Sequence, residues 1–269
     1  MGNRPDRLRI DIEGSTAIVT LTRADKHNGV DLPMLEAVKA SQKRLRGMRD
    51  LRGVILRGEG PSFCSGLDFK SVLGSPLSAI GSYLQLWKPF RNDFQTWSLG
   101  WRKVPVPVVA LLHGSCFGAG LQLGLGADIR VAAPDARLSL MEAKWGLVPD
   151  MGGISLLREL LSIDVAKELT MSGRVVSAEE ALALGLVTHL STEPLEFARG
   201  LLAEFATRSP DSVAAGKFLL QEAWLAPTDE ALGAERRWQR RLLGRGNQRI
   251  AMAGNSGGSE KPFGPRTIG

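Results

Sequence analysis

A glycine-rich turn at residues 113–122, HGSCFGAGLQ, links an apolar run at 106–112 to a helical pattern that continues to Ala127. Gly118 and Gly120 carry no Cβ, so the backbone of this turn can approach a ligand closely. The first N–H groups of the following helix have no partner within the helix and lie at the positive end of its dipole. The turn is therefore suited to hold a negatively charged group.

This turn lacks both the spacing G-x-G-x-x-G and the ending Lys-Ser/Thr, which excludes a dinucleotide fingerprint and a P-loop. Two interpretations remain open for the motif alone. Its N–H groups form an oxyanion hole for a carbonyl oxygen that becomes negative during a reaction, or its glycines only allow a strand and a helix to pack closely.

The elements that position the turn follow from hydrophobic periodicity. Alternation at 8–12 and β-forming residues at 17–22, separated by Gly14, predict a hairpin. Asp31 is expected to cap a helix that carries Leu32, Leu35, Val38 and Leu45 on one side, and a buried strand follows at 53–58. This unit repeats loosely, with strands predicted at 106–112, 129–132 and 137–140 and a helix at 119–127.

The last third of the chain is predicted to be helical. Ser177 and Glu180 form a capping box that starts a helix, and Gly185 ends it. The helical pattern resumes from about Leu195, whereas the tail at 254–269 is glycine-rich and is expected to be mobile unless a partner orders it. We therefore divide the chain into an α/β core at 1–195 and a helical region with a tail at 196–269.

Six aromatic residues recur every three or four positions, which places them on one helical face: Tyr83, Trp87, Phe90, Phe94, Trp97 and Trp101. Pro89 is expected to kink or break this helix. The aromatic face either belongs to the core or lines an apolar tunnel for a ligand.

The composition is typical of a globular protein, with 43% hydrophobic and 23% charged residues among 269. No apolar run is long enough to span a bilayer, and residues 1–6 lack the apolar stretch of a secretory signal. Cys64 and Cys116 cannot form a disulfide framework, and the three histidines are too scattered for metal-ligand spacing. We therefore expect a cytoplasmic protein that binds no metal and no membrane.

Much of the net charge of +6 comes from a cluster of arginines at Arg236, Arg237, Arg240, Arg241, Arg245 and Arg249. Their spacing indicates the solvated basic face of a helix. Nucleic-acid binding would require aromatic residues interleaved with the basic ones, and only Trp238 lies within the cluster. No nucleic-acid partner is expected.

A second glycine turn, PSFCSGLDF at 61–69, directly follows the predicted strand at 53–58. Read together, 61–69 and 113–122 resemble the paired signatures of the crotonase superfamily, which contains the enoyl-CoA hydratases and isomerases. The resemblance covers nearly the whole chain, through the segments 23–29, 137–153, 182–187 and 260–263. In this order and at these spacings the motifs are highly specific.

The resemblance implies a crotonase-type α/β spiral of β-β-α repeats, whose helical C-terminal region packs subunits into trimers, often paired as hexamers. The substrate would be an acyl-CoA thioester, so coenzyme A enters with the substrate and no separate cofactor is expected. By matching position, the backbone N–H groups of Leu67 and Ala119 would hold the thioester oxygen, each contributing about 2.7–4 kcal/mol. The other implied substrate-binding positions are Lys26, His27, Ser65, Gly66, Asp68 and Gly118, with Lys261 and Phe263 supplied by a neighbouring subunit.

The hydratases of this family use two glutamates to activate one water, and the first of these positions is Gln122 here. A carboxamide can orient water but cannot transfer a proton at neutral pH. The second position is Glu142, and Asp150 follows where hydratases usually carry glycine. This pair resembles that of dienoyl-CoA isomerases and of 3-hydroxyisobutyryl-CoA hydrolases, although the dienoyl isomerases have an Asp at position 122. Without the resemblance, Glu142 would be interpreted as an ion-pair partner of Lys144 or an arginine, and Asp150 as a helix N-cap.

Two carboxylates at separate points along an acyl chain are suited to remove a proton at one carbon and deliver one at another. Their proximity and an apolar wall would raise at least one pKa, so that one acts as the acid and the other as the base. We therefore favour an enzyme that shifts double bonds in an unsaturated acyl-CoA through an enolate. Hydration of an enoyl-CoA or hydrolysis of the thioester is the alternative, and an acyl-CoA-binding protein with weak catalysis is a third.

Overall fold

The computed structural model describes residues 7–72, 74, 76–257 and 261–269. Residues 1–6, which the sequence analysis excluded as a secretory signal, lie outside this range, as do residues 258–260 of the tail. Within the described ranges, none of the helices is long and apolar enough to cross a membrane.

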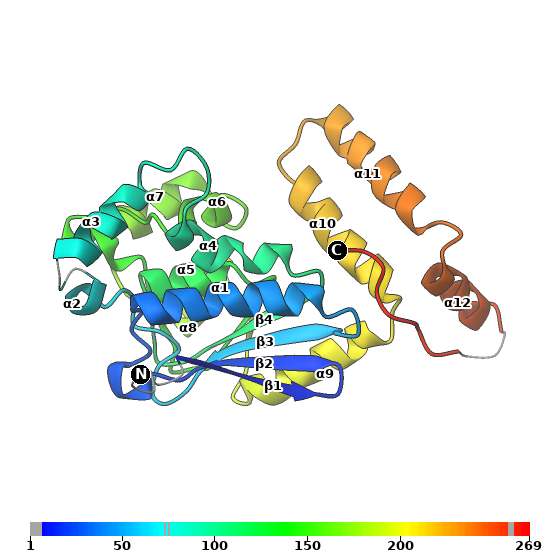
Figure 1. Ribbon diagram of the computed structural model, residues 1–269, viewed down its shortest axis with the longest axis horizontal. Coiled ribbons are helices and arrows are strands. Elements are labelled where there is room, and N and C mark those ends of the chain that lie inside the picture. Colours follow the sequence, from blue (N-terminus) through cyan, green and yellow to red (C-terminus); the bar gives the residue numbers. More distant parts are fainter. Residues whose placement is uncertain (1–6, 73, 75, 258–260) are drawn as a thin grey trace.

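A six-stranded sheet with the order β1-β2-β3-β4-β6-β9 forms the centre of the fold (Figure 1). β1 and β2 are antiparallel, and the four later pairs are parallel. The strands span Leu8–Glu13, Thr16–Leu21, Gly53–Gly58, Val108–Leu112, Ile129–Ala132 and His189–Leu190. Because neighbouring parallel strands end at the same edge of a sheet, the two glycine turns after β3 and β4 lie at one edge.

A small three-stranded sheet continues beyond β4 and contains β5 (Ser115–Phe117), β7 (Arg137–Ser139) and β8 (Val176–Ser177). The sequence predicted 113–122 as a single turn, but residues 115–117 pair in parallel with 137–139. Three residues inside a glycine-rich segment give no strand periodicity, so β5 could not be predicted.

One face of the large sheet is covered by α1 (Leu32–Gly47), α4 (Asp93–Leu99) and α5 (Ala119–Leu125), which enclose the main apolar core (Figure 1). As predicted, Asp31 caps α1 by accepting a hydrogen bond from the Met34 N–H at 2.9 Å. The predicted apolar side of α1 is buried through Leu35, Val38 and Leu45, while Leu32 is only partly buried.

The opposite face of the sheet is covered by α9 (Pro194–Ala206), where Ala198 and Leu202 pack in a cluster with Ile55 and Val109. This helix crosses the predicted division between residues 195 and 196 and belongs with the sheet by its packing. The assignment of 1–195 and 196–269 as separate parts stays a prediction.

The aromatic stripe at 83–101 is divided into two parts at Pro89, as expected from the helix-breaking effect of proline. α3 (Pro76–Gln85) ends before it, and α4 begins after it at Asp93. Trp97 and Trp101 are fully buried in the core, whereas Trp87 and Phe90 are 72% and 86% exposed. The stripe is therefore core in its second half only, because the break removes the common helical axis.

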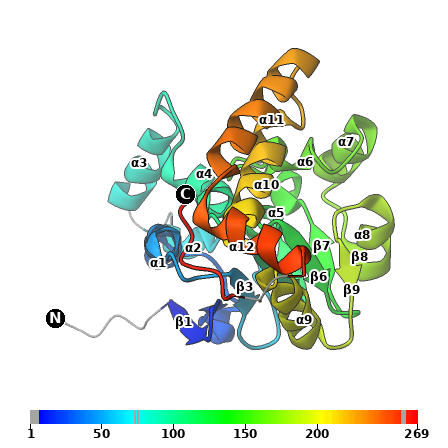
Figure 2. The same ribbon diagram turned by 90° about the vertical axis from the view of Figure 1, so that its right-hand side faces the viewer.

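The C-terminal helices α10 (Pro210–Ala223), α11 (Thr228–Leu242) and α12 (Gly246–Asn255) extend away from the sheet (Figures 1 and 2). Asp211 in the first turn of α10 accepts hydrogen bonds from the N–H groups of Thr267 at 2.6 Å and Ile268 at 3.0 Å. Ile268 is buried against Ala214 and Ala215. The prediction of a mobile tail is wrong for residues 264–268, because contacts within the same chain hold them: α10 binds Thr267 and Ile268, and the Gly264 N–H donates to Asn247 of α12 at 2.9 Å.

The remaining elements connect these layers, and Ser177 caps one of them by accepting a hydrogen bond from the Glu180 N–H at 3.2 Å. Glu180 pairs with Arg174 at 2.7 Å rather than completing the predicted capping box. These elements are η1 (Ala24–Lys26), α2 (Phe69–Val72), η2 (Trp101–Lys103), η3 (Met141–Trp145), α6 (Gly153–Leu157), α7 (Ile163–Ser172) and α8 (Ala178–Leu184).

Candidate active site

The two glycine turns pair with one another beyond the edge of the large sheet. Cys64 and Cys116 form an isolated parallel bridge, in which the Cys64 N–H donates to the Ser115 carbonyl at 3.1 Å. The Phe117 N–H donates back to the Cys64 carbonyl at 3.0 Å. This pairing fixes the segments 61–67 and 115–120 against each other.

Glycine is required where the two turns touch. A Cβ on Gly66, whose φ is +104°, would lie 2.9 Å from the Phe117 carbonyl oxygen and 3.9 Å from the Ala119 nitrogen. A Cβ on Gly120 would lie 2.0 Å from the Cys64 carbonyl oxygen. The glycines therefore allow a close approach of two backbones, which was the packing interpretation, and this approach also brings Gly66 beside the Ala119 N–H.

The two predicted oxyanion donors lie on either side of this contact. Leu67 forms a parallel bridge with Val30, in which the Val30 N–H donates to the Gly66 carbonyl and the Asp68 N–H donates to the Val30 carbonyl. This pattern directs the Leu67 N–H away from Val30. Ala119 is the first residue of α5, so its N–H has no acceptor within the helix. The geometry suits a pair of donors, and their role stays a prediction.

Gln122 is held in one orientation. Its Oε1 accepts hydrogen bonds from the Met151 N–H at 3.0 Å and the Gly153 N–H at 2.9 Å. Because two donors identify this atom as the oxygen, the amide nitrogen must point the other way, where Nε2 donates to Glu142 Oε1 at 2.6 Å. Gln122 is fully buried, and therefore serves as a fixed donor to Glu142.

Glu142 has one oxygen engaged and one free. Oε1 accepts from Gln122, whereas Oε2 is buried and has no hydrogen-bond partner among the described residues. Burial raises the pKa of Glu142, the nearby charge of Asp150 adds to this rise, and the hydrogen bond from Gln122 opposes it. A Cβ on Gly118 would lie 3.2 Å from Glu142 Oε1, so the carboxylate borders the start of α5.

Asp150 follows η3 in the segment that leads to α6. α6 has Gly152 as its N-cap and no side-chain cap, so the interpretation of Asp150 as a cap is wrong. The residue is exposed at the surface, yet enough protein surrounds its carboxyl that desolvation raises the pKa of Asp150. Glu142 does not pair with Lys144 or an arginine within the described chain but bonds Gln122. Both carboxylates are thus left available for chemistry.

Three of the predicted coenzyme A contacts lie together. The Ser65 N–H donates to the His27 carbonyl at 2.9 Å, and His27 Nδ1 lies 3.0 Å from Ser62 Oγ. Lys26 and His27 are exposed beside the second glycine turn. Their side chains can therefore reach a ligand at the edge of the site.

Asp68 is engaged within the chain. Its carboxylate pairs with Arg23 at 2.8 Å and accepts a hydrogen bond from the Ser71 N–H at 3.1 Å. Burial alone would raise the pKa of Asp68, but these two partners outweigh it and lower that pKa. Asp68 therefore fixes the start of α2, and its predicted role as a direct substrate contact is left as a prediction.

Lys261 and Phe263 are not brought to this site in one chain. The neighbouring Gly264 carbonyl accepts from Arg52 at 3.0 Å, and the Arg266 N–H donates to the Arg49 carbonyl at 3.0 Å. Arg49 and Arg52 precede β3, whereas the glycine turn follows its other end. The expectation that a neighbouring subunit supplies Lys261 and Phe263 stays a prediction.

Sequence reasoning missed Asn28 as an organiser of the site. Its Oδ1 accepts from the Arg23 N–H at 2.9 Å, and its Nδ2 donates to the carbonyls of Glu59 at 2.9 Å and Ser62 at 2.8 Å. Asn28 is fully buried and has a positive φ of 53°. An asparagine next to glycine is a signal for this left-handed conformation. It therefore connects the 23–29 loop to the second glycine turn.

A family model described as enoyl-CoA hydratase/isomerase matches residues 11–252, so the chain belongs to this family. It is 30% identical over 212 residues to mouse mitochondrial methylglutaconyl-CoA hydratase, covering 76% of this chain and 65% of that protein. It is 33% identical to carnitinyl-CoA dehydratase of Salmonella typhi, covering 84% of each chain. An enoyl-CoA hydratase structure from Polaromonas sp. JS666 superposes with a TM-score of 0.86 at 27% identity, over 96% of this chain and 99% of that one.

These similarities confirm the predicted superfamily and its α/β fold. The chain spans about two thirds of the length of the mouse hydratase and more of the bacterial relative. The named relatives are hydratases or a dehydratase, so a double-bond isomerase remains a prediction.

Proposed function

We propose that the protein shifts a double bond in an unsaturated acyl-CoA through a thioester enolate. The N–H groups of Leu67 and Ala119 hold the thioester oxygen, and Glu142 and Asp150 move the proton. Lys26, His27 and Ser65 contact the coenzyme A part of the substrate.

The observation that carries this proposal is the asymmetric environment of Glu142. Gln122 holds Oε1 and leaves the buried Oε2 without a partner among the described residues. A buried carboxylate oxygen without a partner is costly, which favours a ligand group or a proton at that position. Since Gln122 cannot exchange a proton, Asp150 is the second acid–base group near Glu142.

The reaction only redistributes protons and bonds within the substrate. One carboxylate removes a proton from a carbon of the acyl chain, and the C–H electron pair moves through the conjugated system onto the thioester oxygen. The oxyanion donors stabilise the resulting enolate. The other carboxylate then protonates a carbon farther along the chain while the thioester carbonyl re-forms. Substrate and product have the same composition, so no oxidant or second substrate is consumed.

Hydration of an enoyl-CoA is the second candidate. It is favoured by the names of the relatives and by the amide at position 122, whose second N–H can orient a water beside Glu142. In that reaction Glu142 alone would have to activate the water and return a proton.

The two reactions are separated by incubating the protein with enoyl-, dienoyl- and hydroxyacyl-CoA panels in heavy water. A double-bond shift with deuterium at the receiving carbon supports the proposal. Hydroxyacyl-CoA without a shifted double bond would establish hydration instead, and release of free coenzyme A would establish hydrolysis. Asp150→Asn is expected to stop deuterium incorporation at the remote carbon while exchange next to the thioester survives. Unchanged turnover and unchanged incorporation at every carbon would contradict the isomerase.

A further inference from the structure

Two adjacent residues of α4 reach the two halves of the candidate site. The Trp97 indole N–H donates to the Ala119 carbonyl at 2.9 Å, and the Ser98 hydroxyl donates to the Met151 carbonyl. Both residues are fully buried, so water does not compete for these hydrogen bonds.

Each bond fixes a residue that the proposed chemistry uses. Ala119 carries one proposed oxyanion donor, and its carbonyl belongs to the first turn of α5. Met151 follows Asp150 directly, and its N–H holds the Oε1 of Gln122, which in turn orients Glu142. α4 therefore contacts both the helix that carries the proposed oxyanion donor and the segment that follows the proposed proton-transfer residue Asp150.

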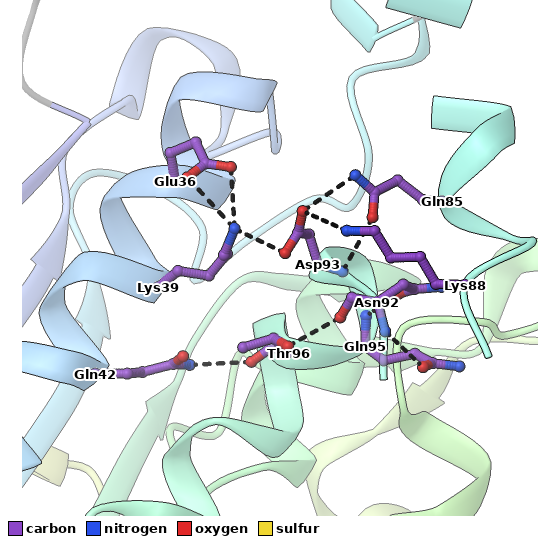
Figure 3. Close-up of polar contacts among 9 residues, drawn as sticks. All are labelled: Glu36, Lys39, Gln42, Gln85, Lys88, Asn92, Asp93, Gln95 and Thr96. Atoms are coloured by element: carbon purple, nitrogen blue, oxygen red, sulfur yellow. Dashed lines mark hydrogen bonds and ion pairs between the residues drawn. The ribbon is translucent and has the colours of Figure 1, made fainter. Parts of the chain in front are cut away.

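α4 is itself anchored to α1, as Figure 3 shows. Asp93 in its first turn pairs with Lys39 at 2.8 Å, and Asn92 forms a capping box with Gln95. Near the other end, Gln42 Nε2 donates to the Thr96 carbonyl at 3.3 Å (Figure 3). It also donates to the Trp97 carbonyl at 3.1 Å. The helix that contacts both halves of the site thus has fixed points at both of its ends.

The packing leaves α4 little freedom to move against the site. A Cβ on Gly126, just after α5, would lie 2.3 Å from the Ser98 carbonyl oxygen. A Cβ on Gly152 would lie 2.6 Å from Ser98 Oγ. Because the backbone of each segment meets the helix directly, each half of the site is packed tightly against α4.

We infer that Trp97 and Ser98 are positioning residues that hold the Ala119 oxyanion donor in register with the Glu142–Asp150 acid–base pair. This inference rests on the proposed function, since it concerns the donor and the carboxylates assigned there. Neither side chain contacts the substrate; each acts through a backbone carbonyl.

Trp97→Phe tests the first bond, and the chain provides a matched control. Trp101 is equally buried, but its indole nitrogen has no hydrogen-bond partner among the described residues. Trp101→Phe therefore removes the same atoms without breaking a hydrogen bond. Trp97→Phe is expected to lower kcat by about ten- to a hundredfold through misplacement of the donor, with little change in KM. Trp101→Phe should leave kcat unchanged.

The readout that separates positioning from a general loss of packing is the infrared stretch of an isotope-labelled thioester carbonyl. Butyryl-CoA serves as the probe because it has no double bond to shift. Oxyanion donors polarise this carbonyl and lower its stretching frequency. When butyryl-CoA is bound to Trp97→Phe, the frequency should therefore move back toward its value in water. Ser98→Ala should leave the frequency unchanged and lower kcat, since it acts on the acid–base half. Ser41→Ala, which removes another buried hydroxyl–carbonyl bond in α1, is its control.

An unchanged carbonyl frequency and kcat in folded Trp97→Phe would overturn the role of Trp97, and equal effects of Ser98→Ala and Ser41→Ala would overturn that of Ser98. Failure of the proposed function would be seen separately, in the wild-type protein. In that case the wild type would polarise the carbonyl of butyryl-CoA but shift no double bond in an unsaturated acyl-CoA. The frequency comparison between wild type and Trp97→Phe would still test the role of Trp97.

Discussion

Gln122→Glu replaces the fixed amide by a second carboxyl group with nearly the same shape. In the wild-type protein Nε2 lies 2.6 Å from Glu142 Oε1, so the new oxygen would lie at a similar distance. Two unit charges 2.6 Å apart repel each other by about 6 kcal/mol at an effective dielectric constant of about 20. This corresponds to a rise of about 4–5 pKa units for the second ionisation.

The pair of carboxyl groups therefore keeps one proton across neutral pH. The N–H groups of Met151 and Gly153 already donate to the other oxygen of residue 122, which places the shared proton between positions 122 and 142. The net charge of the pair stays the same as in the wild type, so the fold is expected to persist. What changes is that position 122 now carries an exchangeable proton.

We expect Gln122→Glu to create or raise hydratase activity, because the family's two-carboxylate arrangement is restored. The assay follows the loss of ultraviolet absorbance of a short conjugated enoyl-CoA. The exchanged variant, Gln122→Glu with Glu142→Gln, keeps one carboxylate and one amide in reversed order and should not hydrate. If folded Gln122→Glu adds water no faster than the wild type, position 122 does not lie next to the reacting carbons.

The raised pKa also has a thermodynamic consequence. The folded variant binds a proton that the unfolded chain releases near pH 4–5, about the ordinary pKa of Glu. Stability gained from this proton is complete below that pH and is lost as the pH rises through the folded-state pKa. The melting temperature of the variant should therefore fall relative to that of the wild type as the pH rises toward alkaline values. A constant difference across that range would show that the two carboxyl groups do not interact.

Four further predictions follow from other contacts. Glu142→Gln should reduce turnover at least about tenfold by removing the proton acceptor, while isothermal titration shows acyl-CoA binding nearly intact; higher residual turnover would remove Glu142 from the mechanism. The negative charge of Asp150 contributes to the raised pKa of Glu142. Asp150→Asn should therefore shift the acid limb of the pH–rate profile to lower pH, where the rate measured is proton exchange at the carbon next to the thioester. An unshifted limb would show that the two groups are uncoupled. Asp211→Ala should lower the free energy of unfolding by about 2–4 kcal/mol, because it leaves the N–H groups of Thr267 and Ile268 without their acceptor. Chemical denaturation measures this change. An unchanged free energy would mean that other contacts hold the tail. The protein is expected to be a trimer or hexamer, with contacts from residue 200 onward that include the exposed Leu220 and Trp224, and a monomer in light scattering at micromolar concentration would contradict this.

Local patterns were enough to predict much of the fold. The hairpin, the Asp31 cap, the strand at 53–58 and the break at Pro89 depend on neighbouring residues, and all four are present. The alternatives that stayed open depended on contacts between distant segments. Spacing along the sequence could not decide whether the aromatic stripe is core, whether the tail is held or whether Asp150 caps a helix. Each of these depends on which other segment of the folded chain packs against the residues concerned.

The sequence by itself determined the positions of the two glycine turns, the amide at 122 and the carboxylates at 142 and 150, and with them the family. These are properties of residue type and order along the chain. The tertiary structure decided what the groups do to one another. Only the folded chain places the N–H groups of Met151 and Gly153 on Gln122 Oε1, which turns its Nε2 toward Glu142 and leaves the second carboxylate oxygen free. An amide has two chemically different ends, and the choice between them is made by donors that lie about thirty residues farther along the chain.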